Sequence, residues 1–272
     1  MPARFGRLIF SLAIIGIGVE TLICSYISTH SIGPHYGVVP VIPWLPGIPS
    51  LSYPFGAIFV LCGAGLLFKR TVVLSSITLG ALMLLSGLAF DVPRRPNVMS
   101  PEWRTNVLEP IAIGSLAWLA PESGRFPRWL HIAGRYLFAF ALIAFGTAHF
   151  QVIHFIAKMV PSWIPWHWFW TVFFGVAFVA AGISLATGFL QRWAASSVGL
   201  MFALWTVTIH LPAVLNFFLI PGTPQDPDKW SDVFLVVALW GGSWALARDL
   251  CGRRNLSLGQ NHIASTNREA NQ

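Results

Sequence analysis

Charged side chains are scarce in this chain. Asp, Glu, Lys and Arg make up only 10% of its 272 residues, whereas apolar residues make up 55%. A soluble domain carries roughly a quarter charged residues, so this chain has too few to cover a globular surface, and lipid must solvate much of it. The net charge of +7 does not indicate a nucleic-acid partner, because the basic residues stand at the ends of apolar runs, where they anchor helices at the lipid interface.

Cysteine and the common catalytic motifs are also sparse or missing. Cys24, Cys62 and Cys251 are far apart and form no CxxC or zinc-binding spacing, so the sequence predicts neither a disulfide framework nor a dithiol redox motif. No HxxxH, ExxH or HExxH pattern occurs, and we predict no metal site. Heme is disfavoured because only His149 and His210 could face each other as its ligands. Nucleophile signatures, phosphate loops and Rossmann fingerprints are absent.

The apolar runs predict an all-α fold, a polytopic membrane bundle of eight transmembrane helices. About 20 helical residues cross a hydrocarbon core of about 30 Å, and unpaired backbone groups are not tolerated there. The eight candidate spans are 8–27, 54–68, 71–90, 105–120, 132–157, 169–189, 193–211 and 231–247, of which the second and fourth are short. The first span lacks a small-x-small cleavage site and has a counterpart later in the chain, so we expect it to be retained.

Short matches in a shared order predict that these spans form two parallel four-helix repeats. The matching elements are Gly6-Arg7-Leu-Ile-Phe10 with Gly134-Arg135-Tyr-Leu-Phe138, Gly18 with Gly146, Trp44-Leu-Pro46 with Trp163-Ile-Pro165, Gly65 with Gly182, Ser75-Ser76 with Ser196-Ser197, Trp103 with Trp230, and Leu119-Ala120 with Leu246-Ala247. The predicted organisation is a first repeat at 1–120, a linker at 121–131, a second repeat at 132–247 and a disordered polar tail at 248–272. Because each repeat has an even number of helices, both enter the membrane from the same side and are related by an axis along its normal.

Orientation follows from the basic residues. With the N-terminus inside, twelve of the 17 Lys and Arg residues face the cytoplasm. The positive-inside rule therefore predicts that the N- and C-termini are both cytoplasmic.

Seven ionisable side chains fall in or at the outer portions of the predicted spans, and four of them stand at matching positions of the two halves: Glu20, within one residue of the match, with His149, and Asp91 with His210. A buried charge must pair or lose its charge, so an intramembrane ionisable residue is a functional-site candidate. The first half offers carboxylates where the second half offers imidazoles. We hypothesise that the four residues line one polar cavity near the outer leaflet and act as its catalytic, proton-handling groups. The alternative is that they bond to neighbouring groups and only fix helix packing.

Aromatic residues cluster after the span that carries His149. Trp163 and Trp166 stand in a proline-rich turn, and Phe150 directly follows His149. These three residues are candidates for contacts with an apolar ligand, such as a quinone head group. The alternative for the tryptophans is the aromatic belt that membrane proteins place at the lipid interface.

Residues 132–215 resemble the DoxX-like family of bacterial membrane proteins. The residues that carry this resemblance are Gly146-x-x-His149-Phe150, Met159-Val-Pro161-x-Trp163-Ile-Pro165, the small residues Gly175, Ala181 and Gly182, and His210-Leu-Pro212. Members of this family typically have four membrane helices, and some are associated with quinone-linked oxidation, sulfur chemistry or oxidative stress. The resemblance implies a location in the bacterial inner membrane and a redox setting with a quinone. The first half departs from the pattern, because Glu20 and Thr21 stand where a histidine would be.

Three functions remain open from the sequence. The leading hypothesis is a component of a quinone-linked redox system, with the lipid bilayer and a redox partner subunit as its partners and with Glu20 and His149 handling protons. The second is a carrier for a small lipophilic or weakly acidic solute, which the duplication suggests. The third is a non-catalytic scaffold. The sequence does not decide whether the protein is an enzyme.

Overall fold

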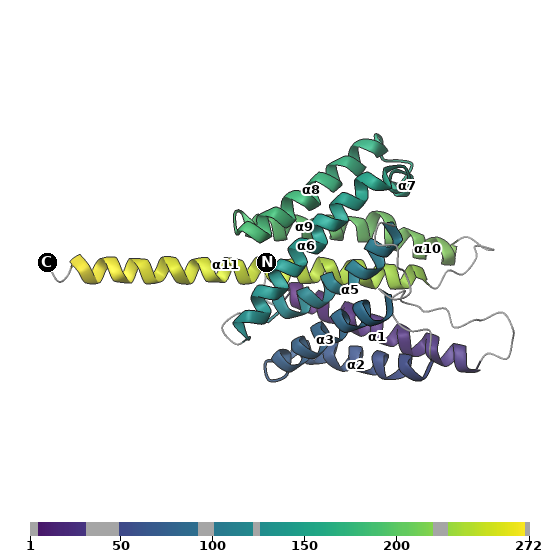
Figure 1. Ribbon diagram of the computed structural model, residues 1–272, viewed down its shortest axis with the longest axis horizontal. Helices are drawn as coiled ribbons and strands as arrows, with labels where there is room; N and C mark the ends of the chain where they lie inside the picture. Colours follow the sequence, from purple (N-terminus) through teal and green to yellow (C-terminus); the bar gives the residue numbers. More distant parts are fainter. Residues whose placement is uncertain (1–4, 31–48, 92–100, 122–125, 220–227, 270–272) are drawn as a thin grey trace.

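The computed structural model describes residues 5–30, 49–91, 101–121, 126–219 and 228–269, and every regular element among them is helical (Figure 1). In chain order the elements are α1 (Phe5–His30), α2 (Pro49–Leu67), α3 (Val72–Ser86), η1 (Gly87–Asp91), α5 (Pro101–Leu119), α6 (Arg128–Gln151), α7 (Ile153–Met159), α8 (His167–Thr187), α9 (Gln191–Trp205), η2 (Thr206–His210), α10 (Leu211–Leu219) and α11 (Asp228–Glu269). Trp44-Leu-Pro46, which we used in predicting the repeat, lies outside the described residues.

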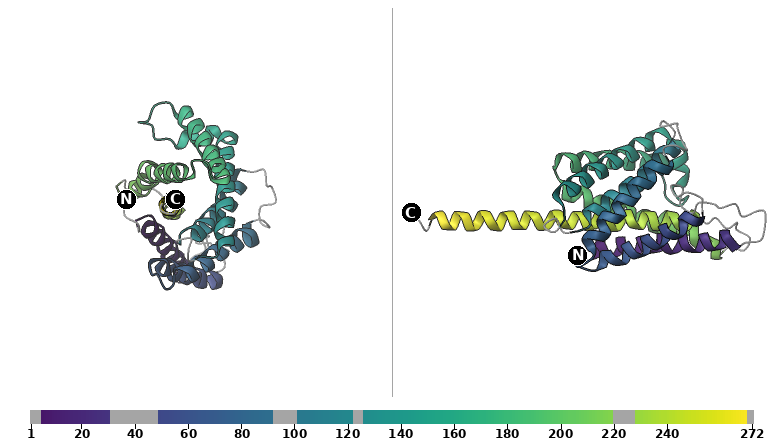
Figure 2. Two further views of the ribbon diagram at one scale, coloured as in Figure 1. Left: turned by 90° about the vertical axis from the view of Figure 1, so that its left-hand side faces the viewer. Right: turned by 60° about the horizontal axis from the view of Figure 1, so that its bottom comes forward.

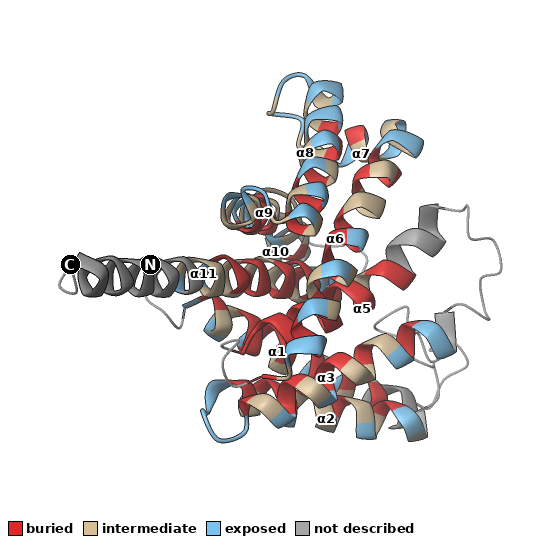
Figure 3. Ribbon diagram, turned by 60° about the vertical axis from the view of Figure 1, so that its left-hand side comes forward, coloured by how far each residue is buried: buried red, intermediate tan, exposed pale blue. Residues whose placement is uncertain are grey.

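The length and composition of the helices make the chain a multi-pass membrane protein. Among the described residues, six helices are long and apolar enough to cross a bilayer, and the shorter apolar helices Leu51–Leu67 and Val107–Leu119 coincide with the two short predicted spans. Large apolar side chains are exposed on the outside of the bundle, as at Leu61 (70%) and Leu74 (69%). Such faces suit hydrocarbon and not water, and Figure 3 shows exposed and buried residues alternating along the same helices.

One predicted span is wrong in its extent. The sequence predicts a continuous helix over 132–157, but α6 ends at Gln151 and a new short helix, α7, begins at Ile153. Val152 between them leaves the helical conformation, with φ −115° and ψ 35°. Both helices are apolar, so hydropathy alone could not detect the break. Helix α7 packs against α8 beside the proline-rich turn.

Two other helices change their winding near the end. Helix α3 passes into the π-helical segment η1, and α9 passes into the π-helical segment η2. Such segments are rare and occur frequently at functional sites. Asp91 is the last residue of η1 and His210 the last residue of η2, so the two residues that we matched in the sequence end the same kind of segment.

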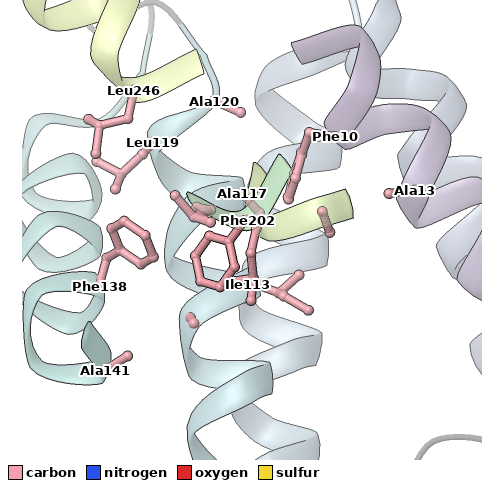
Figure 4. Packing of buried hydrophobic residues seen from close by; sticks show 14 of the residues in the cluster. Phe10, Ala13, Ile113, Ala117, Leu119, Ala120, Phe138, Ala141, Phe202 and Leu246 are labelled. Carbon is pink, nitrogen blue, oxygen red and sulfur yellow. The ribbon is translucent and has the colours of Figure 1, made fainter. Parts of the chain in front are cut away.

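The helices pack in a closed order around one core. Helix α1 packs on α2 and α11, α3 on α2 and α5, α6 on α5 and α8, α9 on α8 and α11, and α5 on α11. Helices α2 and α8 lie on opposite sides of the bundle (Figures 1 and 2). The core cluster draws Phe10 from α1, Ile113 from α5, Phe138 from α6 and Phe202 from α9 (Figure 4).

Glycines let α1 approach α2, and α6 approach α8, at backbone distance. A Cβ atom on Gly18 would lie 2.7 Å from the carbonyl oxygen of Gly56, and one on Gly146 would lie 2.6 Å from that of Gly175. Two turns beyond Gly175 on α8, a Cβ atom on Gly182 would lie 2.6 Å from the Ala139 carbonyl oxygen of α6. Because lipid supplies little hydrophobic force between helices, this close contact is what holds such pairs together.

The helices α5 and α11 join the two parts of the bundle. A Cβ atom on Gly134 of α6 would lie 2.9 Å from the Ser115 carbonyl oxygen of α5, and one on Gly6 of α1 would lie 2.8 Å from the Gly241 carbonyl oxygen of α11. Beyond the span that ends at Gly252, α11 continues as a helix to Glu269 and projects from the bundle (Figure 1). This extension covers most of the tail that we predict to be disordered.

Gly146 provides a test of the close packing. We expect Gly146→Leu to lower the free energy of unfolding by about 1–3 kcal/mol, because the new side chain meets the backbone of α8, which cannot turn aside. Denaturation in mild detergent, followed by circular dichroism, measures the change. Gly252→Leu is the control, because nothing lies within 4 Å of a Cβ atom there. Equal stability of the two variants would contradict the packing described.

Candidate functional site

His149 lies two residues before the end of α6 and is buried, with 7% of its surface exposed. Its Nδ1 atom lies 2.8 Å from the carbonyl oxygen of Phe145, one helical turn earlier. A carbonyl oxygen can only accept a hydrogen bond, so Nδ1 carries the proton and donates it. In the neutral imidazole, Nε2 therefore presents a lone pair and is an acceptor.

Aromatic rings from α8 and α9 contact this imidazole. Trp205 of α9 stacks on it, with ring centroids 5.8 Å apart and planes 23° apart, and Phe178 of α8 meets it edge-on at 5.3 Å. We use the name aromatic box for Phe178 and Trp205 together with the three rings that pack on them, which are Phe145, Phe174 and Phe202. Offset and edge-on aromatic pairs each contribute about 0.5–1.5 kcal/mol beyond the area that they bury.

The glycine contact between α6 and α8 places the box against His149. A Cβ atom on Gly175 would lie 3.0 Å from the Cβ atom of His149 and 2.9 Å from the ring of Phe150. Phe150, predicted to contact a ligand, therefore lies over the same glycine on the neighbouring helix, with 43% of its surface exposed. A larger residue at 175 would push α8, and with it Phe178, away from the imidazole.

The Nε2 atom of His149 is shielded from solvent and has no hydrogen-bond partner among the described residues. A buried acceptor without a partner costs about 1–3 kcal/mol, so it requires an explanation. Other buried polar atoms among the described residues also have no hydrogen-bond partner, namely Nε1 of Trp118 and of Trp240, Nε of Arg135, Oε1 of Gln191 and the hydroxyls of Ser76 and Ser243. A hydroxyl can rotate toward a carbonyl group of its own helix. The imidazole cannot, because its Nδ1 bond fixes the ring.

The other predicted proton-handling residues lie on other helices than His149. Glu20 is half-buried on α1, whose main packing partners are α2 and α11, whereas His149 lies on α6, which packs on α5 and α8. His210 is half-buried at the end of η2, five positions after Trp205. Asp91 ends η1, and its side chain lies outside the described residues. Within the described residues, His149 contacts the carbonyl oxygen of Phe145 and the rings of Phe178 and Trp205. The cavity shared with carboxylates stays a prediction.

The predicted ligand contacts Trp163 and Trp166 stand in the turn between α7 and α8 and are largely exposed, at 72% and 77%. Trp166 precedes α8 with a left-handed backbone, φ 60° and ψ 51°. The connection from this turn to His149 passes through Trp170, whose Nε1 donates to the Pro165 carbonyl oxygen at 3.1 Å. Trp170 stacks on Phe174 at 5.9 Å, and Phe174 meets Trp205 at 5.3 Å.

The break at Val152 separates His154 from His149. His154 is exposed on α7 and meets the edge of Trp168 at 4.6 Å. It therefore belongs to the surface of the α7–α8 region.

One ionisable pair has no signal in the sequence. Nε2 of His131, near the start of α6, lies 3.4 Å from Oδ2 of Asp249 on α11; His131 is buried and Asp249 is partly buried. The two residues are distant in the chain and belong to no motif, so only the fold, in which α6 and α11 both pack on α5, reveals them. In the part of the chain that the structure describes, no group of three His, Cys, Asp or Glu side chains lies close enough to hold a metal ion.

Comparisons with known proteins found no family model, no curated protein and no solved structure that matches this chain. The functional argument therefore depends on the chemistry of the described residues.

Substitution of His149 separates a structural role from a binding role. His149→Phe removes the buried acceptor and keeps a ring of similar volume, so we expect the free energy of unfolding to change by less than about 1 kcal/mol. Trp205→Ala leaves a cavity in the aromatic box and should cost about 3 kcal/mol. Denaturation in detergent measures both. If His149→Phe destabilises the protein as strongly as Trp205→Ala, the role of the imidazole is to stabilise the packing of the helices.

Proposed function

We propose that the protein is a membrane component of a quinone-linked redox system and binds a quinol-class ring at His149. The observation that carries this proposal is the buried Nε2 acceptor of His149, enclosed by aromatic rings. A membrane-soluble ligand with an O–H group on an apolar ring satisfies both features. Its hydroxyl donates to Nε2, and its ring packs against the aromatic box. The electron acceptor belongs to a redox partner subunit.

The fixed tautomer supports a quinol as the bound form. Neutral His149 has its proton on Nδ1, so Nε2 accepts a hydrogen bond from a hydroxyl and offers nothing to a carbonyl. An imidazole positioned on an O–H group in this way is also suited to take its proton as a general base. Glu20 and His210 lie on other helices and would take part in later proton transfer.

Entry of the ligand requires a ring of the box to move. Phe174 and Trp205 are only half-buried, whereas Phe178 and Phe202 are buried. Trp205 is also the last residue before the π-helical segment η2, where the winding of the helix changes. A ring that arrives from lipid along Trp170 and Phe174 meets Trp205 first, and the exposed Trp163 and Trp166 stand at the start of that route.

The same proposal includes eight membrane spans in two parallel four-helix units of the DoxX-like kind, in a bacterial inner membrane with both termini in the cytoplasm. Support comes from the equivalent contacts of the two halves. A Cβ atom on Gly18 would meet the Gly56 carbonyl oxygen and the N and Cγ2 atoms of Val60 on α2, and one on Gly146 would meet the same three atoms of Gly175 and Val179 on α8. Gly80 meets Trp118 and Gly199 meets Trp244 in the same way.

Binding of tetramethylhydroquinone tests the function. We expect the purified protein in lipid nanodiscs to bind this quinol, and His149→Leu to weaken binding about tenfold or more, as the loss of one buried hydrogen bond implies. Isothermal titration under argon measures the dissociation constants. His154→Leu is the matched control, since His154 is exposed on α7, and it should bind as the wild type does.

A second ligand sharpens the test. The dimethyl ether of tetramethylhydroquinone keeps the ring but has no hydroxyl to donate. It should therefore bind to the wild type about tenfold or more weakly than the quinol does. The His149→Leu variant should bind the ether and the quinol equally. Equal binding of quinol and ether by the wild type would contradict the role of Nε2, and unchanged quinol binding by His149→Leu would contradict the site.

The second candidate function is a carrier for a small lipophilic or weakly acidic solute. The equivalent contacts of the two halves favour it, because many carriers are built from internal repeats with the binding site inside the bilayer. Uptake of a weak organic acid into proteoliposomes that is lost in Glu20→Gln would favour the carrier over the redox component.

A further inference from the structure

The two halves of the chain differ at the position that holds His149. On α1, the hydroxyl of Thr21 donates to the carbonyl oxygen of Ile17 at 2.7 Å, just as Nδ1 of His149 donates to that of Phe145 at 2.8 Å. His149 follows Thr21 by 128 positions, and Phe145 follows Ile17 by the same number. Gly146 and Gly18, which make the helix contacts in the two halves, are also 128 positions apart. Thr21 is therefore the counterpart of His149.

The partner helices give the counterparts of the aromatic box. Helix α2 and helix α8 are related by 119 positions (175 minus 56), and so are η1 and η2 (206 minus 87). With this shift, Phe59 matches Phe178, and both are fully buried. Phe55 matches Phe174, and Met83 matches Phe202. At the position of the stacking residue Trp205, the first half has Ser86.

With Thr21 in the place of His149 and Ser86 in the place of Trp205, the first half lacks the features that make His149 a candidate site. The Thr21 hydroxyl is satisfied within α1, and the buried Ser86 hydroxyl donates to the Met83 carbonyl oxygen at 2.9 Å within α3. Thr21 has no second nitrogen to leave without a partner, and Ser86 has no ring to stack on a ligand. The first half thus keeps the fold of the box while its two polar groups are internally satisfied.

We infer that the chain binds one quinol-class ligand, in the second half, and that the Thr21–Ser86 position of the first half is a closed counterpart of the His149–Trp205 site. This inference rests on the proposed function, since it concerns the number and position of the same ligand. It assigns Thr21 and Ser86 as the residues that close the first site. Two positions in each half then decide whether that half binds.

Exchange of these residues between the halves is the test, with tetramethylhydroquinone as the probe and titration in nanodiscs as the readout. We expect one ligand per chain for the wild type. His149→Thr with Trp205→Ser should bind none, and this variant should fold, because it uses residues that the first half already packs. Thr21→His with Ser86→Trp should bind two. All four changes together should restore one ligand, now in the first half.

The outcomes separate this inference from the proposed function. No binding by the wild type would overturn the proposed function itself. Binding of two ligands by the wild type would overturn only the inference that the first half is closed. One ligand on Thr21→His with Ser86→Trp, in protein that elutes as wild type from size exclusion and melts at the same temperature, would show that these residues do not close the first site. One ligand retained by His149→Thr with Trp205→Ser would place the site elsewhere.

Discussion

The close approach of backbones at glycine determines where every functional group of this bundle lies. In lipid, helices gain little by hiding apolar surface from one another, so contact between backbones replaces the hydrophobic effect as the source of a defined packing. Gly146 against Gly175 is the contact that matters for the site, because it fixes the distance between α6 and α8. His149 lies one turn from Gly146, and Phe178 one turn from Gly175. The imidazole and the first ring that contacts it are thus set by the same pair of residues.

Much of the architecture could be predicted from the sequence because hydropathy and helical geometry are strong signals in a membrane. The all-helical fold, the six long apolar helices and the shorter second and fourth apolar helices follow from residue type and position. The break at Val152 could not be predicted, since an apolar helix and an apolar turn have the same hydropathy. Nor could Trp205 and Phe178 be singled out among so many aromatic residues. Their role depends on which ring packs on which, and only the packing of α8 and α9 decides that.

Identical letters also misled the comparison of the two halves in places. The sequence pairs Gly182 with Gly65, but Gly182 contacts Ala139 and Ile143 as Gly63 contacts Ser11 and Ile15. Contacts with the neighbouring helix are therefore a better guide to equivalent positions than residue identity is. The sequence places Glu20 next to Thr21, the residue that matches His149, and this suggested that Glu20 and His149 are partners. Matching positions of the two halves lie on different helices, however, and α1 packs on α2 and α11 whereas α6 packs on α5 and α8.

The difference between Thr21 and His149 shows how small a chemical change distinguishes a structural polar group from a candidate site in lipid. Both side chains donate one hydrogen bond to the carbonyl oxygen one turn earlier in their helix. For threonine this bond satisfies the only hydrogen that the side chain offers. For histidine the same bond fixes the tautomer and leaves a second, opposite nitrogen as an acceptor within a shell of aromatic rings. Keeping that acceptor costs free energy that a phenylalanine would not, so a binding role accounts for the histidine better than packing does.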